Sequence, residues 1–270
     1  MSPDGSAQLT SRQRNEIAYH REHARRVAAG IPHTGLTAVP KSWNHYGAAL
    51  SILTEAGVAG RRVLVPGCGA GFDAIQCALM GGIVTAIDLS PEMLQVAEAA
   101  AFDAHTQVEF LCMPVEDLTV PASSFDVIFI RDLLHHCDIE RAISELIRVA
   151  KPGALFVIDE LYTHTVLQRA RESAFGRLLY SIVCKWIYDG EEPYITPDER
   201  KIDEKEFELV CRALAENRCE YWNTFVNRFM PDWDWAQILD RALTRPLGAL
   251  GKYVAGRVLV TGRVPCMPGC

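Results

Sequence analysis

Apolar and polar residues alternate in blocks along the middle of the chain. Short apolar runs, the pattern of buried strands, occur at residues 61–67, 83–89, 108–114, 125–130 and 154–161. Amphipathic stretches between them predict helices at residues 74–82, 90–104 and 138–150. Ser90 and Pro91 suit the N-cap and first position of the second of these helices, and Lys151-Pro152-Gly153 ends the third. This alternation predicts a parallel sheet with helices on both faces.

The segments on either side of this block follow a different pattern. Helices are expected over residues 11–29 and 43–56, each followed by a glycine. Residues 162–215 are expected to be mostly helical, interrupted by an acidic segment that contains prolines. Two further strands are expected at residues 219–229 and 256–264, with an insert between them.

Composition excludes several classes of protein. A length of 270 residues suits one α/β domain with appended elements better than two independent cores. The formal net charge of −7 argues against a broad basic surface for nucleic acid. No stretch approaches the ~18 apolar residues needed to span a bilayer, and the first residues lack the apolar core of a secretory signal. We therefore expect a cytoplasmic protein.

The cysteine and histidine patterns do not indicate a metal site. The nine cysteines are scattered, so most are expected to be small buried apolar residues. Cys266 and Cys270 could bind a metal or cross-link, but a frayed terminus is the simpler interpretation. His20 and His23 lie one helical turn apart without a nearby carboxylate or cysteine pattern, which favours a solvated helix. No metal is expected.

The strongest local signal is the glycine-rich turn that follows the first strand. Gly67, Gly69 and Gly71 let backbone amides approach a ligand without a Cβ in the way. Gly71 follows Gly69 after one residue, so the spacing differs from the dinucleotide-binding G-x-G-x-x-G. Asp88 ends the next strand, 17 residues after Gly71, where an acid can bind both ribose hydroxyls of an adenosine-containing ligand. The alternative is that Asp88 caps the following helix.

Four motifs carry a resemblance to a known family. VLVPGCGAGFDA, VTAIDLSPEML, VEDLTVPASSFDVIFIRDLLHH and ISELIRVAKPGALFVIDE resemble the successive motifs of class I S-adenosylmethionine (SAM)-dependent methyltransferases, of the type 11 or 12 domain. The resemblance covers about residues 60–160, and the VLVPGCG turn is similar to that of the thiopurine-methyltransferase-like branch. It implies a Rossmann-like, doubly wound seven-stranded sheet, mostly parallel with a C-terminal antiparallel hairpin.

The resemblance also implies a division of the chain. Residues 1–56 would form an N-terminal helical lid, and residues 57–161 the SAM-binding core. Residues 162–215 would be a helical substrate-binding insert, and residues 216–270 would complete the sheet.

The cofactor implied by the family is SAM, and its product is S-adenosylhomocysteine. The resemblance assigns cofactor contacts to Gly67, Cys68, Gly69, Gly71, Asp88, Leu89, Val115, Glu116 and Arg131. The glycine turn would lie beneath the methionyl part, Asp88 would hold the ribose and Leu89 would pack on the adenine. Val115 and Glu116 would frame the adenine edge, and Arg131 would lie where SAM and the acceptor meet.

Two positions depart from the family pattern. The family usually has an acid two places before the first glycine of the turn, where this chain has Val65-Pro66. It also often has an acid at the position of Pro114. The amino group of the cofactor and the adenine therefore need other contacts, with Glu116 as a candidate for the adenine.

Catalytic candidates follow the fourth strand. Methyl transfer is an in-line displacement, and a base helps when the acceptor is a hydroxyl. His135 and His136 suit that role at neutral pH, with Asp132 beside them. The alternative is that both histidines only pack against or order the loop.

Candidate substrate contacts come from two segments. Tyr19 lies on the expected N-terminal lid helix, and Tyr180, Trp186 and Tyr194 belong to the aromatic insert. The insert aromatics could line an apolar acceptor pocket or cover the sheet as ordinary core. Trp222, Trp233 and Trp235 could complete such a pocket.

These observations favour a methyltransferase that acts on oxygen or nitrogen of a small, partly apolar or aromatic metabolite, with natural-product biosynthesis as a candidate setting. An RNA or protein substrate is disfavoured because the chain is acidic and lacks an NPPY-type motif after the fourth strand. One alternative is a non-methylating SAM-binding enzyme such as a cyclase or decarboxylase. A non-catalytic partner subunit is disfavoured by the intact glycines and Asp88. Both a monomer and a homodimer remain open.

Overall fold

The computed structural model describes residues 9–28, 41, 43–173, 201–224, 226 and 233–266. The three insert aromatics expected to contact substrate, Tyr180, Trp186 and Tyr194, lie outside these residues, as does Cys270.

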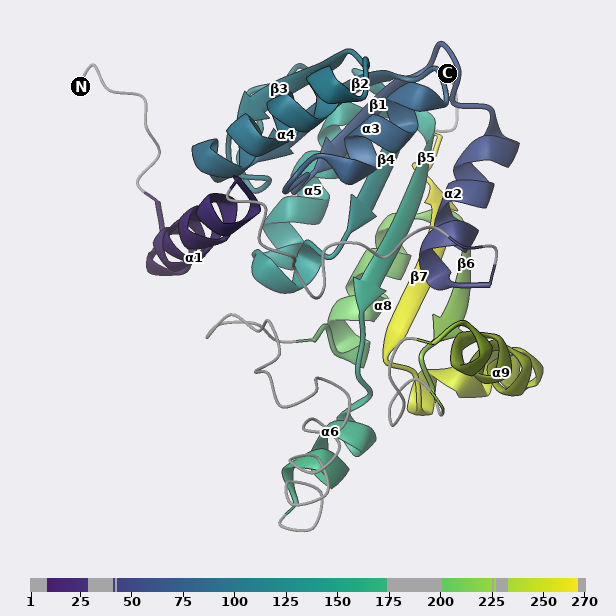
Figure 1. Cartoon of the computed structure of the whole chain (residues 1–270). Helices are drawn as coiled ribbons and strands as arrows, with labels where there is room; N and C mark the ends of the chain where they lie inside the picture. Colours follow the sequence, from purple (N-terminus) through teal and green to yellow (C-terminus); the bar gives the residue numbers. More distant parts are fainter. Residues whose placement is uncertain are drawn as a thin grey trace.

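A seven-stranded sheet forms the centre of the structure, with the strand order β3-β2-β1-β4-β5-β7-β6. Its strands are β1 Arg62–Pro66, β2 Ile83–Asp88, β3 Val108–Cys112, β4 Phe125–Arg131, β5 Ala150–Leu161, β6 Ala215–Trp222 and β7 Arg257–Arg263. Strands β1 to β5 are parallel, whereas β7 runs antiparallel to both β5 and β6. Figure 1 shows the seven strands in this order from left to right. The expected Rossmann-like sheet with its C-terminal antiparallel hairpin is confirmed.

Helices cover both faces of the sheet because alternate strand residues point in opposite directions. In β4, Val127 and Phe129 pack towards α2 and α3, while Ile128 and Ile130 pack towards α5 and α8. The helices are α1 Ser11–Ala28, α2 His45–Ala56, α3 Phe72–Leu79, α4 Pro91–Asp103, α5 Ile139–Val149, α6 Thr165–Glu172, α8 Glu204–Ala213 and α9 Asp234–Thr244, with the 3₁₀ segments η1 Leu134–His136 and η3 Arg245–Tyr253. None of the described helices is long and apolar enough to cross a membrane.

Two expected boundaries are wrong. Strand β6 spans Ala215–Trp222 rather than residues 219–229. It ends because Asn223 adopts a positive φ of 54° and the Thr224 amide then bonds to Asp240 on α9, which takes the chain away from the sheet. Strand β5 begins at Ala150, before Lys151-Pro152-Gly153. Helix α5 ends at Val149, and Ala150 already pairs with Phe125 of β4.

Two segments that are far apart in the sequence meet just after the end of β5. Tyr162 forms an isolated parallel bridge with Ile202. The mostly helical prediction for residues 162–215 holds for α6 and α8, with residues 174–200 outside the described part. Helix α6 lies beyond the carboxyl end of β5, away from the sheet (Figure 1).

The cysteine prediction is confirmed in part. Cys68, Cys77 and Cys137 are buried in the core, and all described cysteines are free. Cys112 is exposed because it ends the edge strand β3, and Cys266 is exposed near the end of the described chain. Among the described residues, no group of three or more acidic, histidine or cysteine side chains could hold a metal ion.

The packing of α3 against α4 requires glycine at residue 71. Gly71 has φ 85°, and a Cβ there would lie 2.9 Å from Ala97 Cβ and 3.1 Å from Ala97 Cα. We predict that Gly71→Ala lowers the free energy of unfolding by about 2–5 kcal/mol, because left-handed strain and overpacking add. Denaturant titration measures this loss.

Gly60→Ala is the matched control, because Gly60 has φ 73° but nothing within 4 Å of its added Cβ. It should lose only the strain contribution of about 1–2 kcal/mol. Equal losses in the two variants would show that the α3–α4 contact does not constrain this position.

Candidate functional site

The glycine turn links the end of β1 to the start of α3. Its three glycines all have positive φ, at 63°, 50° and 85° for Gly67, Gly69 and Gly71. A Cβ on Gly67 would lie 2.7 Å from Leu133 Cδ1, so the turn packs directly on the loop after β4. A Cβ on Gly69 would meet only Met93 Cε, at 3.9 Å. A Cβ would therefore have more room at Gly69 than at Gly67.

Asp88 ties this turn to the start of α4. Its Oδ2 accepts a hydrogen bond from the Gly69 amide at 2.8 Å, and its Oδ1 accepts one from the Ser90 amide at 2.9 Å. The N-cap of α4 is Ser90, whose hydroxyl accepts from the Met93 amide. The alternative role of Asp88 as the cap of α4 is therefore wrong. A carboxylate offers about four acceptor positions, so this one can accept further hydrogen bonds.

The residues expected to contact the adenine follow β2 and β3. Val115 is buried, and Leu89 directly follows β2. Glu116 Oε1 accepts a hydrogen bond from the Asp138 amide, and its Oε2 accepts one from Gln13 Nε2 on α1, both at 3.2 Å. Glu116 therefore links three segments at this edge.

The loop after β4 is organised by Glu160, a fully buried carboxylate on β5. It accepts hydrogen bonds from the amides of Leu133 at 3.0 Å and Leu134 at 2.6 Å, and from His135 Nδ1 at 2.5 Å. His135 is only 2% exposed, and its ring lies 4.0 Å from that of His136. Glu160 was not among the residues predicted from the sequence, although an acid inside an apolar strand was a signal for it.

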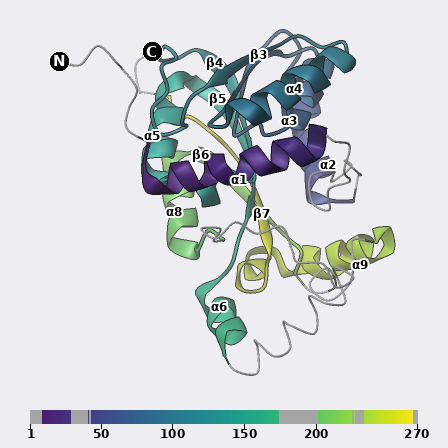
Figure 2. The ribbon, with the colours of Figure 1, turned by 60° about the vertical axis from the view of Figure 1, so that its left-hand side comes forward.

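Helix α1 crosses this edge of the sheet. Arg12 donates to the carbonyl oxygens of His135 and Cys137, at 2.5 and 3.3 Å. At the other end of the helix, Arg21 pairs with Glu92 on α4, and Ala24 packs with Ala70 of the glycine turn. Figure 2 shows α1 running below α4 from the side of α5 towards α2. The helix thus covers the glycine turn and the loop after β4.

A buried carboxylate fixes the middle of α1. Glu16 is 7% exposed, accepts a hydrogen bond from His136 Nδ1 at 3.2 Å and lies 3.5 Å from His20 Nε2. Burial raises the pKa of Glu16, but the hydrogen bonds and charges of His136 and His20 outweigh it and lower the pKa to about 2. Tyr19, the expected substrate contact, is partly buried beside His20.

An ion pair joins α3 to the end of β4. Arg131 Nε lies 3.1 and 2.9 Å from the two carboxylate oxygens of Asp73, in the first turn of α3. The guanidinium also lies 4.5 Å from the centre of the Tyr46 ring on α2. Burial, followed by the charge of Asp73, raises the pKa of Tyr46. Arg131 was expected at this position, whereas Asp73 and Tyr46 were missed.

A second group of charges lies beside it. Asp132, at φ 52°, accepts a hydrogen bond from Arg257 Nη2 at 2.7 Å. Arg257 Nε also bonds to the fully buried Asp159 at 3.2 Å, and His45 Nδ1 bonds to the same carboxylate at 2.6 Å. Burial raises the pKa of Asp159, but Arg257 and His45 hold it below its usual range. Of this group, only Asp132 was predicted from the sequence.

The remaining aromatic candidates do not converge on the site. Trp222 is buried in the core beneath Arg241, whose guanidinium lies 3.7 Å from its ring. Trp233 and Trp235 lie against each other and are exposed at the start of α9.

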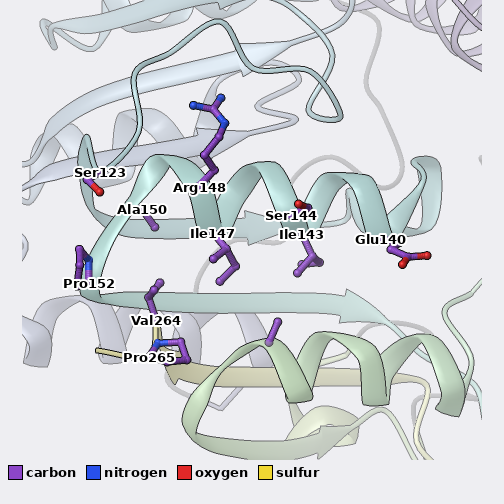
Figure 3. A pocket seen from close by; sticks show the side chains of 11 residues that line it. Ser123, Glu140, Ile143, Ser144, Ile147, Arg148, Ala150, Pro152, Val264 and Pro265 are labelled. Atoms are coloured by element: carbon purple, nitrogen blue, oxygen red, sulfur yellow. The ribbon is translucent and has the colours of Figure 1, made fainter. Parts of the chain in front are cut away.

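The depression in Figure 3 lies elsewhere, at the opposite end of the parallel strands. Its lining includes Ile143 and Ile147 from α5, Pro152 at the start of β5 and Pro265 after β7. It therefore takes no part in the site at the glycine turn.

Comparison with known proteins agrees with this geometry. Residues 64–158 match the model of a methyltransferase domain. A ubiquinone biosynthesis O-methyltransferase of Xanthomonas oryzae is 37% identical over 106 residues, which cover 38% of this chain and 44% of the relative. The chain thus spans less than half the length of this curated relative.

Solved structures show the same fold over most of the chain. The [4+2]-cyclase SpnF has a TM-score of 0.58 at 20% identity, and 96% of this chain and 97% of that chain are covered. A second structure is phosphoethanolamine N-methyltransferase 2 of Haemonchus contortus, in complex with phosphomonomethylethanolamine and S-adenosylhomocysteine. Its TM-score is 0.59 at 17% identity, and the match covers 96% of this chain and 61% of that chain. At these identities the likeness concerns the fold.

The sheet, the glycine turn and the matched domain together define a SAM-dependent methyltransferase domain. Residues 64–158 of the chain are thus similar to a methyltransferase domain, and the fold is one that SAM-dependent methyltransferases share.

The position of α1 depends on Glu16. We predict that Glu16→Gln lowers the hydrogen-exchange protection of α1 amides by about tenfold or more, because hydrogen bonds to a buried charge are lost. Since the folded-state pKa of Glu16 is lowered to about 2, its contribution is present above about pH 4.5 and is lost as the pH falls towards 2.

The control is Glu22→Gln, which removes an exposed carboxylate from the same helix. This variant should leave the hydrogen exchange of the α1 amides nearly unchanged. If both variants exchange like the wild type at neutral pH, Glu16 does not hold α1 in place.

Proposed function

We propose that the protein binds SAM at the glycine turn and transfers its methyl group to an oxygen of a small, partly apolar or aromatic metabolite. The observation that carries the proposal is the carboxylate of Asp88, held against the Gly69 amide at the end of β2. The choice of oxygen is supported by the names of the relatives, which are O-methyltransferases.

The residues at the turn fit this cofactor. Asp88 retains acceptor capacity for two ribose hydroxyls, and an added Cβ on Gly69 would meet only Met93 Cε, at 3.9 Å. Leu89, Val115 and Glu116 would then contact the adenine. The methionyl part would lie on Gly67, Cys68, Gly69 and Gly71, with Arg131 at its far end. Bound SAM supplies a methyl group activated by a sulfonium.

Among the catalytic candidates, the geometry favours His136 as the base. His135 is enclosed and its Nδ1 is bonded to Glu160. His136 is less enclosed, with its side chain 19% exposed, and its Nδ1 bonds to Glu16. Its Nε2 can then take the proton of an acceptor hydroxyl, while Glu16 stabilises the imidazolium. His135 and Asp132, whose side chain is about a third exposed, would shape the loop and the mouth of the site.

Calorimetric titration with SAM tests the binding claim. We predict wild-type affinity in the micromolar range, at ~8 kcal/mol. Asp88→Ala should weaken binding by about tenfold to a hundredfold, because it removes charged hydrogen bonds to the ribose. Asp103→Ala, which removes an exposed carboxylate at the end of α4, is the control and should bind like the wild type. Unchanged affinity in the Asp88 variant would refute the ribose assignment.

The reaction needs a separate assay, because a non-methylating enzyme would also bind SAM. We predict that phenolic or other hydroxyl-bearing small acceptors yield S-adenosylhomocysteine and a methyl ether in equal amounts, measured by chromatography and mass spectrometry. His136→Gln should lower kcat by about a hundredfold. It should raise KM by much less. Conversion of an acceptor with the SAM retained unchanged would instead identify a cyclase or decarboxylase.

A further inference from the structure

Two cysteines from neighbouring elements lie in contact with each other. Cys211 belongs to the last turn of α8 and Cys219 to the middle of β6, and their Sγ atoms are 3.8 Å apart. The two sulfurs are therefore in van der Waals contact, about 1.8 Å farther apart than in a disulfide. Both residues are half-buried, so each side chain keeps some surface that a small reagent can reach.

Other described cysteines lie in different surroundings. The sulfurs of Cys68, Cys112 and Cys137 lie near backbone carbonyl oxygens, at 3.9, 3.7 and 3.5 Å. In the part of the chain that the structure describes, only Cys211 and Cys219 show two sulfurs within hydrogen-bonding distance of each other. This pair is therefore the candidate for chemistry that needs two thiols.

The backbone around the two cysteines holds them in this arrangement. Leu214 alone separates α8 from β6. The Asn217 side chain donates to the carbonyl oxygens of Cys211 and Leu214, at 2.9 and 3.0 Å. An irregularity in the pairing of β6 with β7 then brings Cys219 opposite Val260, on the face of the sheet that packs against α8. The fold therefore places the two thiols next to each other.

The hydrogen bond between the thiols makes one of them the better nucleophile. The bond from Cys211 outweighs burial and holds the pKa of Cys219 below its usual range. The same bond, together with burial, raises the pKa of Cys211. A thiolate is the attacking species in thiol–disulfide exchange. Cys219 is therefore suited to react first, with Cys211 beside it to displace the group that it acquires.

We propose that Cys211 and Cys219 form a modification site, at which exchange with a small disulfide of the glutathione class produces a reversible disulfide between α8 and β6. The Cys219 thiolate attacks one sulfur of the small disulfide, forms a mixed disulfide and releases one thiolate, which takes up a proton. Cys211 then loses its proton and attacks the Cys219 sulfur, and this releases the second small thiol. The two protein thiols lose two electrons and two protons, and the small disulfide is reduced to two thiols.

Tryptic mapping of the full chain tests the proposal. The reduced protein is treated with glutathione disulfide, its remaining thiols are alkylated, and the chain is then digested with trypsin. Cleavage after lysine and arginine puts the two cysteines on separate peptides, residues 206–212 and 219–228. We expect mass spectrometry to find these two peptides joined, two hydrogens lighter than their sum, and a reductant to separate them again.

The same reaction in protein unfolded by urea measures what the fold contributes. At equilibrium with mixtures of glutathione and its disulfide, the effective concentration of the two thiols should be about tenfold or more higher in the folded protein. Equal values in the two states would show that the fold does not hold the thiols for this reaction, and would overturn the proposal. Both measurements use the wild type, so they remain decisive if a variant fails to fold.

Two variants and a control separate the roles of the thiols. Cys211→Ser should leave glutathione bound to Cys219, because the thiol that displaces it is gone. Cys219→Ser should leave Cys211 free for alkylation. Cys112→Ser is the matched control, because Cys112 is exposed and its sulfur lies near a carbonyl oxygen. It should leave the yield of the joined peptides unchanged. Wild-type protein in which Cys112 takes up glutathione while the two peptides stay separate would contradict the proposal.

Discussion

The site depends on two adjacent buried carboxylates at the end of β5. Successive strand residues point to opposite faces, so Asp159 and Glu160 serve different neighbours. Asp159 binds Arg257 and His45, while Glu160 holds the amides and the histidine of the loop after β4. A buried charge without partners is costly, so these contacts fix the loop on the sheet. The glycine turn and α1 then pack on that loop.

The covering helix couples the cofactor site to the loop that carries the candidate base. Helix α1 contacts the loop after β4 through Arg12 and Glu16, and α4 through Arg21. The ligand proposed for the glycine turn would therefore lie beneath a helix held mainly by polar contacts.

The sheet was predictable from the sequence because its strands are short, apolar and separated by helices with clear signals at their ends. Ser90, for example, caps α4 as expected. The end of β6 was not predictable, because the chain leaves the sheet through a tertiary bond between Thr224 and Asp240. The glycines and Asp88 were found because they are adjacent to strand ends. Asp73, Arg257 and His45 were missed because only folding brings their distant segments together.

The most direct test of the account is a crystal structure of the protein with S-adenosylhomocysteine. The account predicts that both ribose hydroxyls bond to the carboxylate of Asp88, with the thioether over the glycine turn and α1 closed above the ligand. A ligand bound at another edge of the sheet, or one whose ribose does not contact Asp88, would contradict it.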